Sequence, residues 1–225
     1  MSARKVPPTP PLTRARVLDA AIGVADDGGV VAVTMRRVAD ALGVEAMSLY
    51  HHVASKDDIL DGMVDVVFSQ ITLPDPDADW RAAMKRRARS AREALSRHAW
   101  VLALVESRRN PGPATLRHHE AVLASLRRAG FSPLEAGVAF AALDSYVYGY
   151  VLQESNLPFS TAQELDLIAR ELDAEPETPY PHLTEMLRAY ARQPTASPDA
   201  YEVGLDLLLD GLERRRLAGG SASDQ

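Results

Sequence analysis

The chain has 225 residues, contains no Cys and carries a formal net charge of −6. The lack of Cys excludes a disulfide framework and a thiolate metal site, and the length is sufficient for a substantial hydrophobic core. The first residues lack the apolar segment of a signal peptide, and no apolar run approaches the roughly 18 residues of a membrane span. We therefore expect a cytoplasmic protein with no membrane partner.

Charge is distributed unevenly along the chain. Residues 1–56 contain seven Lys or Arg and five Asp or Glu, a net of +2, whereas the remainder contains 18 basic and 26 acidic residues, a net of −8. A mildly basic N-terminal part on an acidic body is typical of a protein that offers one end to DNA. The distribution argues against a protein that simply coats nucleic acid.

The first predicted helix follows a Pro-rich, polar stretch at residues 1–11, which we expect to be a disordered arm. The helix covers residues 13–26, where apolar residues recur at helical spacing, and Asp27 and the two glycines after it end the helix. We expect it to support the next two helices from behind.

Residues 34–56 predict two short helices around a tight turn. Thr34 is a suitable N-cap, an apolar face follows it at helical spacing, and Gly43 marks the break. A second helix at residues 46–52 places Leu49 and Val53 inward. This is the arrangement of a helix-turn-helix, whose second helix enters the DNA major groove, although a helical hairpin of another all-α protein would share it.

A fourth helix begins with Ser55 as its N-cap and Asp58 at N3, a carboxylate version of the capping box. Its apolar residues continue to about residues 69–71, and the Pro- and Asp-rich segment 73–79 cannot extend it. We place a domain boundary there. Residues 12–72 then form the helix-turn-helix domain with its linking helix, and residues 73–217 form a larger helical body.

The body begins with a helix at residues 80–98 that has one strongly basic face. A solvated surface explains this face better than a second nucleic-acid site does. A shorter helix at residues 100–108, a Pro-containing loop at 108–113 and a helix at 114–129 follow. The basic face consists of Arg81, Lys85, Arg86, Arg89 and Arg92.

The clearest helix start lies at Ser132 and Pro133, with Glu135 at N3. The helix that follows is apolar almost all round, so we expect it to be buried on several sides. No segment has a strand pattern, and the predicted fold class is all-α. The remaining predicted elements are the long helix itself at 133–154, an irregular region at 155–180 with one short helix at 161–172, helices at 181–192 and 199–217, and a flexible tail at 218–225.

Three segments carry a resemblance to a known family. The run A-D-A-L-G-V-x-x-x-S-L-Y-x-H-V-x-x-K, at residues 39–56, resembles the helix-turn-helix of the TetR family of transcriptional repressors. The segments at 129–154 and 203–215 resemble the regulatory body of the tetracycline-repressor branch. The resemblance implies a ligand-responsive repressor that binds a palindromic operator as a homodimer and is released by a small hydrophobic effector.

The resemblance and the chemistry of the side chains together assign the expected DNA contacts. Cations and polar rings suit phosphates, and residues on the outer side of the second short helix suit base edges. Apolar side chains there would contact thymine methyl groups. The expected contacts are Arg36, Tyr50, His51 and Lys56 for phosphate or base edges, and Ala46, Met47 and Ser48 for the bases.

A dimer interface is expected on the last helix, packed with helix 133–154. Gly204, Leu208 and Gly211 fall on one face, where Gly permits close approach of another helix, and two half-sites on DNA require a twofold protein. Internal packing in a monomer would explain the same face.

The body is expected to hold an apolar, aromatic effector pocket with few polar groups. In the tetracycline-repressor branch a His before the Pro-containing loop holds the metal of the drug, whereas residues 104–113 here contain no His and offer Glu106 instead. We therefore expect no response to magnesium–tetracycline. No metal site is expected at His118 and His119 either, because adjacent residues on a helix face different ways, and no cofactor is expected. The candidate pocket residues are Trp100, Leu104, Arg108, His118, Val122, Val138, Tyr146 and Tyr150.

Two other classes of protein compete with the repressor. An enzyme is disfavoured because the chain has no nucleophile elbow, no phosphate-binding Gly loop and no H-E-x-x-H motif. An all-helical protein–protein adaptor without DNA binding remains the alternative, and a gel shift with the upstream region of its own gene would discriminate the two.

Overall fold

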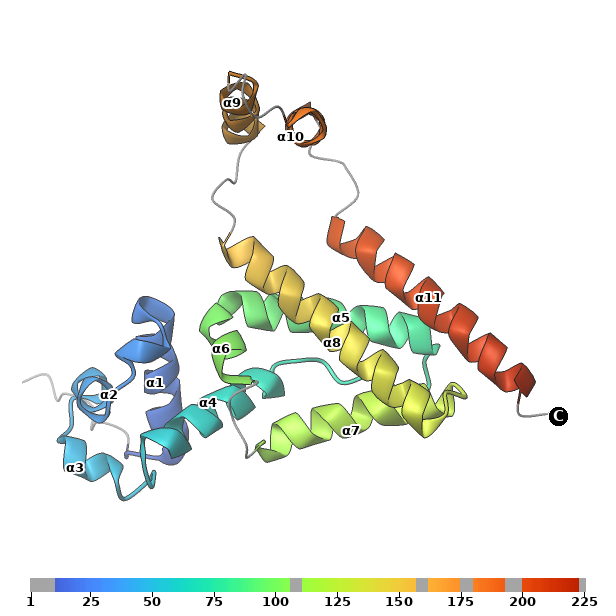
Figure 1. Cartoon of the computed structure of the whole chain (residues 1–225). Helices are drawn as coiled ribbons and strands as arrows, with labels where there is room; N and C mark the ends of the chain where they lie inside the picture. Colours follow the sequence, from blue (N-terminus) through green and yellow to red (C-terminus); the bar gives the residue numbers. More distant parts are fainter. Residues whose placement is uncertain (1–10, 106–110, 157–161, 175–179, 193–199, 223–225) are drawn as a thin grey trace, which may run out of the picture.

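The computed structural model (Figure 1) describes residues 11–105, 111–156, 162–174, 180–192 and 200–222. Within these ranges every regular element is a helix, so the predicted all-α fold class is confirmed. No helix in the described part has the length and apolar character that crossing a membrane requires. The elements are α1 (Arg14–Gly28), η1 (Val30–Ala32), α2 (Met35–Leu42), α3 (Ala46–Leu49), α4 (Lys56–Ser69), α5 (Trp80–Arg97), η2 (Ala99–Val101), α6 (Leu102–Val105), α7 (Pro113–Arg128), α8 (Pro133–Asn156), α9 (Ala162–Asp173), α10 (Pro181–Arg192) and α11 (Ala200–Ala222).

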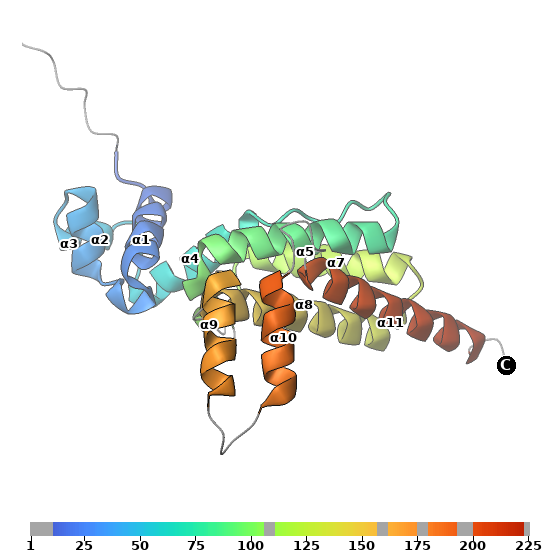
Figure 2. The same cartoon turned by 90° about the horizontal axis from the view of Figure 1, so that it is seen from above.

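Helices α1, α2 and α3 form a small unit at one end of the molecule (Figures 1 and 2). Its core is made by the apolar faces that the spacing predicts, including Val17, Val38 and Leu49, each 0% exposed. Helix α4 begins in this unit and runs into the body, where it packs along α7. The linking role expected of the fourth helix therefore has a structural counterpart.

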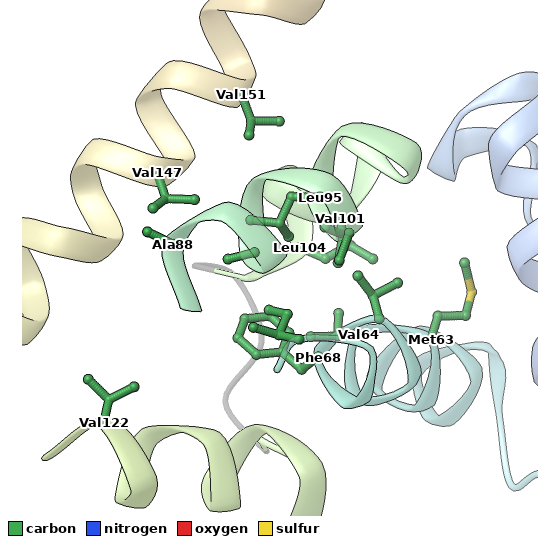
Figure 3. Packing of buried hydrophobic residues seen from close by; sticks show 14 of the residues in the cluster. Met63, Val64, Phe68, Ala88, Leu95, Val101, Leu104, Val122, Val147 and Val151 are labelled. Carbon is green, nitrogen blue, oxygen red and sulfur yellow. The ribbon is translucent and has the colours of Figure 1, made fainter. Parts of the chain in front are cut away.

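The core of the body forms where α4, α5, α6, α7 and α8 meet. Figure 3 shows Phe68 of α4 directed into the space between these helices, with Val64 of the same helix beside it. Phe68 is 1% exposed and Val122 of α7 is 0% exposed. The helix that begins in the N-terminal unit thus also supplies part of the core of the body.

The long helix α8 begins with the predicted capping box. Ser132 Oγ accepts the Glu135 N–H at 3.3 Å, and Glu135 Oε2 accepts the Ser132 N–H at 2.9 Å. The expectation that α8 is buried on several sides is confirmed, because α8 packs against α5, α7 and α11. One stripe of small and apolar residues nevertheless stays exposed in the single chain. This α8 stripe consists of Gly137, Val138, Ala141, Ser145, Gly149 and Leu152.

The basic face of α5 packs against acidic residues of α11 and α8, so the expectation of a merely solvated face is wrong in part. Arg81 pairs with Asp210 at 2.5 Å, and Lys85 pairs with Asp206 at 2.7 Å. Arg89 holds Glu202 and Arg92 holds Glu154. Sequence patterns cannot assign these pairs, since the partners lie more than 60 positions away along the chain.

Two predicted boundaries differ from the structure. The short helix expected at 100–108 is a 3-10 turn followed by α6, which reaches Val105; residues 106–110, with Glu106 and Arg108, lie outside the described residues. Helix α11 continues through residues 218–222, where we expected a flexible tail. Of the predicted arm at residues 1–11, residues 1–10 lie outside the described part.

Helices α9 and α10 pack against each other and project from the body (Figures 1 and 2). Ala169 and Leu187 are buried between them, at 0% and 4% exposure. The short helix predicted at 161–172 corresponds to α9.

Candidate DNA-binding surface and effector cavity

The turn between α2 and α3 has the geometry that a helix-turn-helix requires. Thr34 caps α2 by accepting the Arg37 N–H at 3.2 Å. Gly43 adopts the left-handed conformation, with φ 69°, which favours Gly over any residue with a Cβ. The Val44 N–H then bonds to the Ala39 carbonyl at 3.1 Å and closes the turn.

Helix α3 and the turn after it have one buried side and one exposed side. Leu49 is 0% and Val53 is 2% exposed, so both anchor the helix, whereas Met47 is 73% and Tyr50 is 49% exposed. Ala46 and Ser48 are half-buried, and His51 is exposed. The structure therefore brings the five residues predicted on this segment to one exposed end of the unit.

Arg36 in the first turn of α2 and Lys56 at the first position of α4 are both exposed. Within the described part of the chain, the side chains of the seven predicted DNA contacts form no hydrogen bond or ion pair. Their cations and hydroxyls are thus available to another molecule.

The start of α4 is fixed to α1 by a bidentate ion pair. Asp58 accepts from Arg14 at 2.6 and 2.7 Å. The Arg14 guanidinium holds the pKa of the Asp58 carboxyl below its usual range. Ser55 caps α4 as predicted, but Asp58 accepts the Ala54 N–H at 2.8 Å in place of the Ser55 N–H of a regular capping box.

A cavity of about 180 Å³ lies between α4 and the N-terminal end of α7. Asp65 of α4 accepts the backbone N–H of Thr115 at 2.8 Å and its hydroxyl at 3.1 Å. Asp65 thus supplies the oxygen for the start of α7, because the N-cap residue Gly112 has no side chain. The cavity is lined by Asp61, Val64, Phe68, Val105, Pro111, Gly112, Thr115 and His119.

None of the predicted pocket residues that the structure describes lines this cavity. His118 and Val122 are buried in α7, and Leu104 is buried in α6. Val138 is 47% exposed on the α8 stripe, so it faces outward in the single chain. Trp100 donates from Nε1 to Asp26 of α1 at 2.6 Å and therefore lies at the seam between the N-terminal unit and the body.

Tyr146 and Tyr150 belong to the packing of α8 against α11. The Tyr146 hydroxyl donates to the Tyr201 carbonyl at 2.8 Å, and the rings of Tyr150 and Tyr201 meet edge-on at 4.9 Å. Tyr150 also lines a more open hollow of about 390 Å³ at the base of α9 and α10, with Leu165, Met186, Leu187 and Tyr190. This second hollow does not include a residue of α4.

A buried polar network between α5, α7 and α8 was not predicted from the sequence. Arg87, 1% exposed, donates from Nε to His118 Nε2 at 3.1 Å and from Nη2 to Asp144. The Tyr148 hydroxyl donates to the other oxygen of Asp144 at 3.0 Å. A signal was present, since Arg87 stands on the apolar stripe of its helix between Met84 and Ala91, and Asp144 interrupts the apolar run of α8.

Burial keeps the two histidines of α7 neutral. The pKa of His118 is lowered to about 3, first by burial and second by the Arg87 charge. Burial also lowers the pKa of His119. The neutral His118 ring therefore accepts a hydrogen bond from Arg87 and does not act as a cation.

The structure separates the three predicted dimer residues. A Cβ on Gly204 would lie 2.3 Å from the Tyr146 hydroxyl oxygen, so Gly204 makes room for packing within the chain, as the alternative of internal packing expects. Leu208 is half-buried against the core. A Cβ on Gly211 would have no atom within 4 Å among the described residues, so that position is open.

Comparisons with known proteins agree with this arrangement. The model "Bacterial regulatory proteins, tetR family" matches residues 17–63, and "Tetracyclin repressor-like, C-terminal domain" matches residues 73–216. A transcriptional regulator of Saccharopolyspora erythraea is 39% identical over 65% of this chain, which spans 62% of that relative. The repressor DrrR1 of Streptomyces coeruleorubidus is 34% identical, over 92% of this chain and 79% of its own length.

The fold is also that of a solved relative. ActR of Streptomyces coelicolor, in complex with actinorhodin, superposes with a TM-score of 0.72 and 29% identity, over 93% of this chain and 98% of that one. Matches to both family models cover the helix-turn-helix and the body. The chain therefore belongs to the TetR family, whose members are DNA-binding regulators of transcription and not enzymes.

Proposed function

We propose that this protein represses transcription by binding a palindromic operator as a homodimer, and that a small, largely apolar effector in the α4–α7 cavity releases it. The observation that carries the proposal is a shared helix: α4 begins in the DNA-binding unit and lines the cavity through Asp61, Val64 and Phe68. A molecule that alters the cavity therefore acts on the helix that positions the DNA contacts.

The DNA contacts divide by chemistry. Lys56, Arg36 and the polar rings of Tyr50 and His51 suit phosphates, which give affinity and salt dependence. Met47, the most exposed of the predicted contacts on α3, suits an apolar contact with a thymine methyl group. Affinity at every sequence and preference between sequences should therefore respond to different substitutions.

The exposed stripe of α8 and the outer face of α11 support a dimer. Val203 and Leu207 of α11 are 46% and 67% exposed, and Leu152 of α8 is 53% exposed. Gly137 and Gly149 leave the backbone of α8 open to close approach, since a Cβ on either meets nothing within 4 Å of the described chain. Exposed apolar surface of this kind marks interaction sites. Val138 is thereby reassigned from the pocket to this surface.

An effector of small size is supported by the relative whose structure contains actinorhodin. The α4–α7 cavity is favoured over the hollow at Tyr150 because it touches α4. We keep the prediction that magnesium–tetracycline is not the effector; Glu106 and Arg108, which it concerns, lie outside the described residues.

A gel shift with the upstream region of the protein's own gene tests the proposal. Lys56→Ala should weaken binding at all sequences and reduce the slope of the salt dependence by about 1, because one phosphate is no longer neutralised. Met47→Ala should instead change the preference between operator variants that carry or lack a thymine methyl. Arg170→Ala, on α9 away from the DNA-binding unit, is the matched removal of a surface cation and should change neither.

Two results would count against the proposal. A Lys56→Ala protein with unchanged affinity and salt slope would remove Lys56 from the DNA contacts. Failure of the wild-type protein to shift any upstream fragment would favour the adaptor.

A further inference from the structure

Two N–H donors of the Arg87–His118–Asp144 network have no acceptor within the described part of the chain. They are Arg87 Nη1 and His118 Nδ1. Because His118 Nε2 accepts from Arg87, the single proton of the neutral imidazole lies on Nδ1. An arginine nitrogen is a donor in every state. Each of these buried atoms therefore lacks the acceptor that a buried donor normally finds.

The network has no net charge with which to attract an ion. Asp144 neutralises Arg87, and both neighbouring histidines stay neutral because burial lowers the pKa of each. An anionic ligand would lie beside the Asp144 carboxylate with no uncompensated cation to oppose the repulsion. A neutral group with acceptor oxygens fits these donors better.

The two donors lie behind the wall of the α4–α7 cavity, separated from it by one layer of aromatic rings. Phe68 and His119 line the cavity, and their rings meet the His118 ring edge-on at centroid distances of 5.6 and 6.0 Å. Phe140 packs on the other side of His119 at 5.0 Å. The cavity, at about 180 Å³, is smaller than the roughly 300 Å³ or more of typical ligand pockets. A ligand that turns Phe68 and His119 aside would gain both space and the two donors.

We propose that Arg87 and His118 bind the carbonyl oxygens of a neutral, planar aromatic effector, a quinone or an aromatic ketone, through these two N–H groups. The aromatic walls supply the apolar contact, and the two donors supply selectivity for oxygen. The inference rests on the proposed function in taking this cavity as the effector site, and it adds the chemical class of the effector.

Equilibrium dialysis of the full chain against three probes of one ring system tests the inference. Naphthalene has no acceptor oxygen, 1,4-naphthoquinone has two neutral ones, and 2-naphthoate carries a charge. The chain contains no Cys, so the quinone cannot be trapped by a thiol. We expect 1,4-naphthoquinone to bind about tenfold or more tightly than naphthalene, since satisfying a buried donor is worth that ratio. 2-Naphthoate should bind no more tightly than naphthalene.

Variants test the role of the network. His118→Phe removes one donor and keeps a ring, so the preference for the quinone should shrink. His182→Phe, which changes an exposed histidine of α10 outside both the network and the cavity, should retain it. Should His118→Phe fail to fold, the double variant Arg87→Met, Asp144→Leu serves instead. It replaces the buried ion pair by apolar groups, a change that proteins often tolerate. This variant should abolish the preference for the quinone.

Equal binding of naphthalene and 1,4-naphthoquinone by the wild-type protein would overturn the inference, as would a quinone preference that survives both network variants. Tighter binding of 2-naphthoate than of the quinone would also overturn it. The dialysis contains no DNA, so failure of operator binding or release appears only in the gel shift and is distinguishable from failure here.

Discussion

The close approach of Gly112 to Asp65 makes Gly112→Ala a sharp perturbation of the joint between α4 and α7. The backbone of Gly112 has φ −74° and ψ 172°, which any residue can adopt, so an alanine causes no backbone strain. Its Cβ, however, would lie 2.3 Å from Asp65 Cγ and 2.4 Å from Oδ1. The carboxylate must therefore move away from Thr115.

The magnitude follows from the hydrogen bonds that the substitution breaks. Asp65 accepts two hydrogen bonds from Thr115, at 2.8 and 3.1 Å, and thereby caps α7. Bonds to a charged group each contribute about 1.5–3 kcal/mol, less where solvent reaches them, and removing a cap costs about 1 kcal/mol. Asp65 is partly exposed. We therefore expect Gly112→Ala to lower the free energy of unfolding by about 2–3 kcal/mol.

Urea denaturation followed by circular dichroism measures this decrease. Gly23→Ala is the matched control, because Gly23 lies on the exposed side of α1 and an added Cβ would meet nothing within 4 Å. Helix propensity predicts that this change raises the free energy of unfolding by about 0.5–1 kcal/mol. Asp65→Ala should cost about as much as Gly112→Ala, and the double variant less than the sum, since both changes remove the same bonds. Wild-type stability of Gly112→Ala, or full additivity with Asp65→Ala, would refute the reasoning.

Two further predictions concern the dimer and the pH dependence of stability. Leu207→Asp, on the exposed face of α11, should give a monomer in sedimentation velocity. Gly204→Ala should leave the dimer intact and lower the free energy of unfolding by about 1–3 kcal/mol, because its Cβ overpacks against Tyr146. A monomer with Gly204→Ala and an intact dimer with Leu207→Asp would assign Gly204 to the interface. Burial lowers the pKa of His118 to about 3 in the folded chain, so between about pH 6.5 and pH 4 only the unfolded chain binds a proton on this ring. The free energy of unfolding should therefore decrease as the pH is lowered from about 6.5 to about 4, by up to about 1.4 kcal/mol per pH unit. His118→Gln should reduce that slope, and an unchanged slope in urea titrations would contradict the assignment.

Features encoded by neighbouring residues could be predicted from the sequence. Thr34, Ser55 and Ser132 cap helices as expected, because a cap depends on residues two or three positions away. Gly43 and the apolar spacing around it similarly indicated the turn of the helix-turn-helix. The exposure of Met47 follows from the burial of Leu49 and Val53 on the opposite side of a short helix.

Features that depend on distant partners could not be predicted in this way. Gly204 fits equally well as a dimer contact or as space for an internal ring, and only the position of Tyr146 decides between them. The basic face of α5 has the pattern of a solvated surface until α11 brings its acidic residues to it. Asp65 shows no local reason for its identity, because the helix that it caps begins almost 50 positions later.

Trp100, one of the residues predicted for the pocket, lies between α1 and the body. Its Nε1 donates to Asp26 Oδ1 at 2.6 Å, and His98 Nδ1 contacts the same oxygen at 2.8 Å. Asp26 stands in the last turn of α1, so the two rings hold the end of the DNA-binding unit. The environment of Trp100 therefore depends on the position of α1 relative to the body.

We accordingly expect Trp100 fluorescence to report operator binding. The chain has two Trp residues, and Trp80 is 8% exposed against Phe131, so Trp80→Phe leaves Trp100 as the single emitter. Operator DNA should change its emission, because binding two half-sites fixes the position of each α1. Asp26→Ala should greatly reduce the change by releasing the ring, whereas Asp27→Ala, the exposed neighbour, should preserve it. An equal response in both variants would show that Trp100 senses something other than the attachment of α1. The contact between Trp100 and Asp26 would then play no part in coupling operator binding to the body.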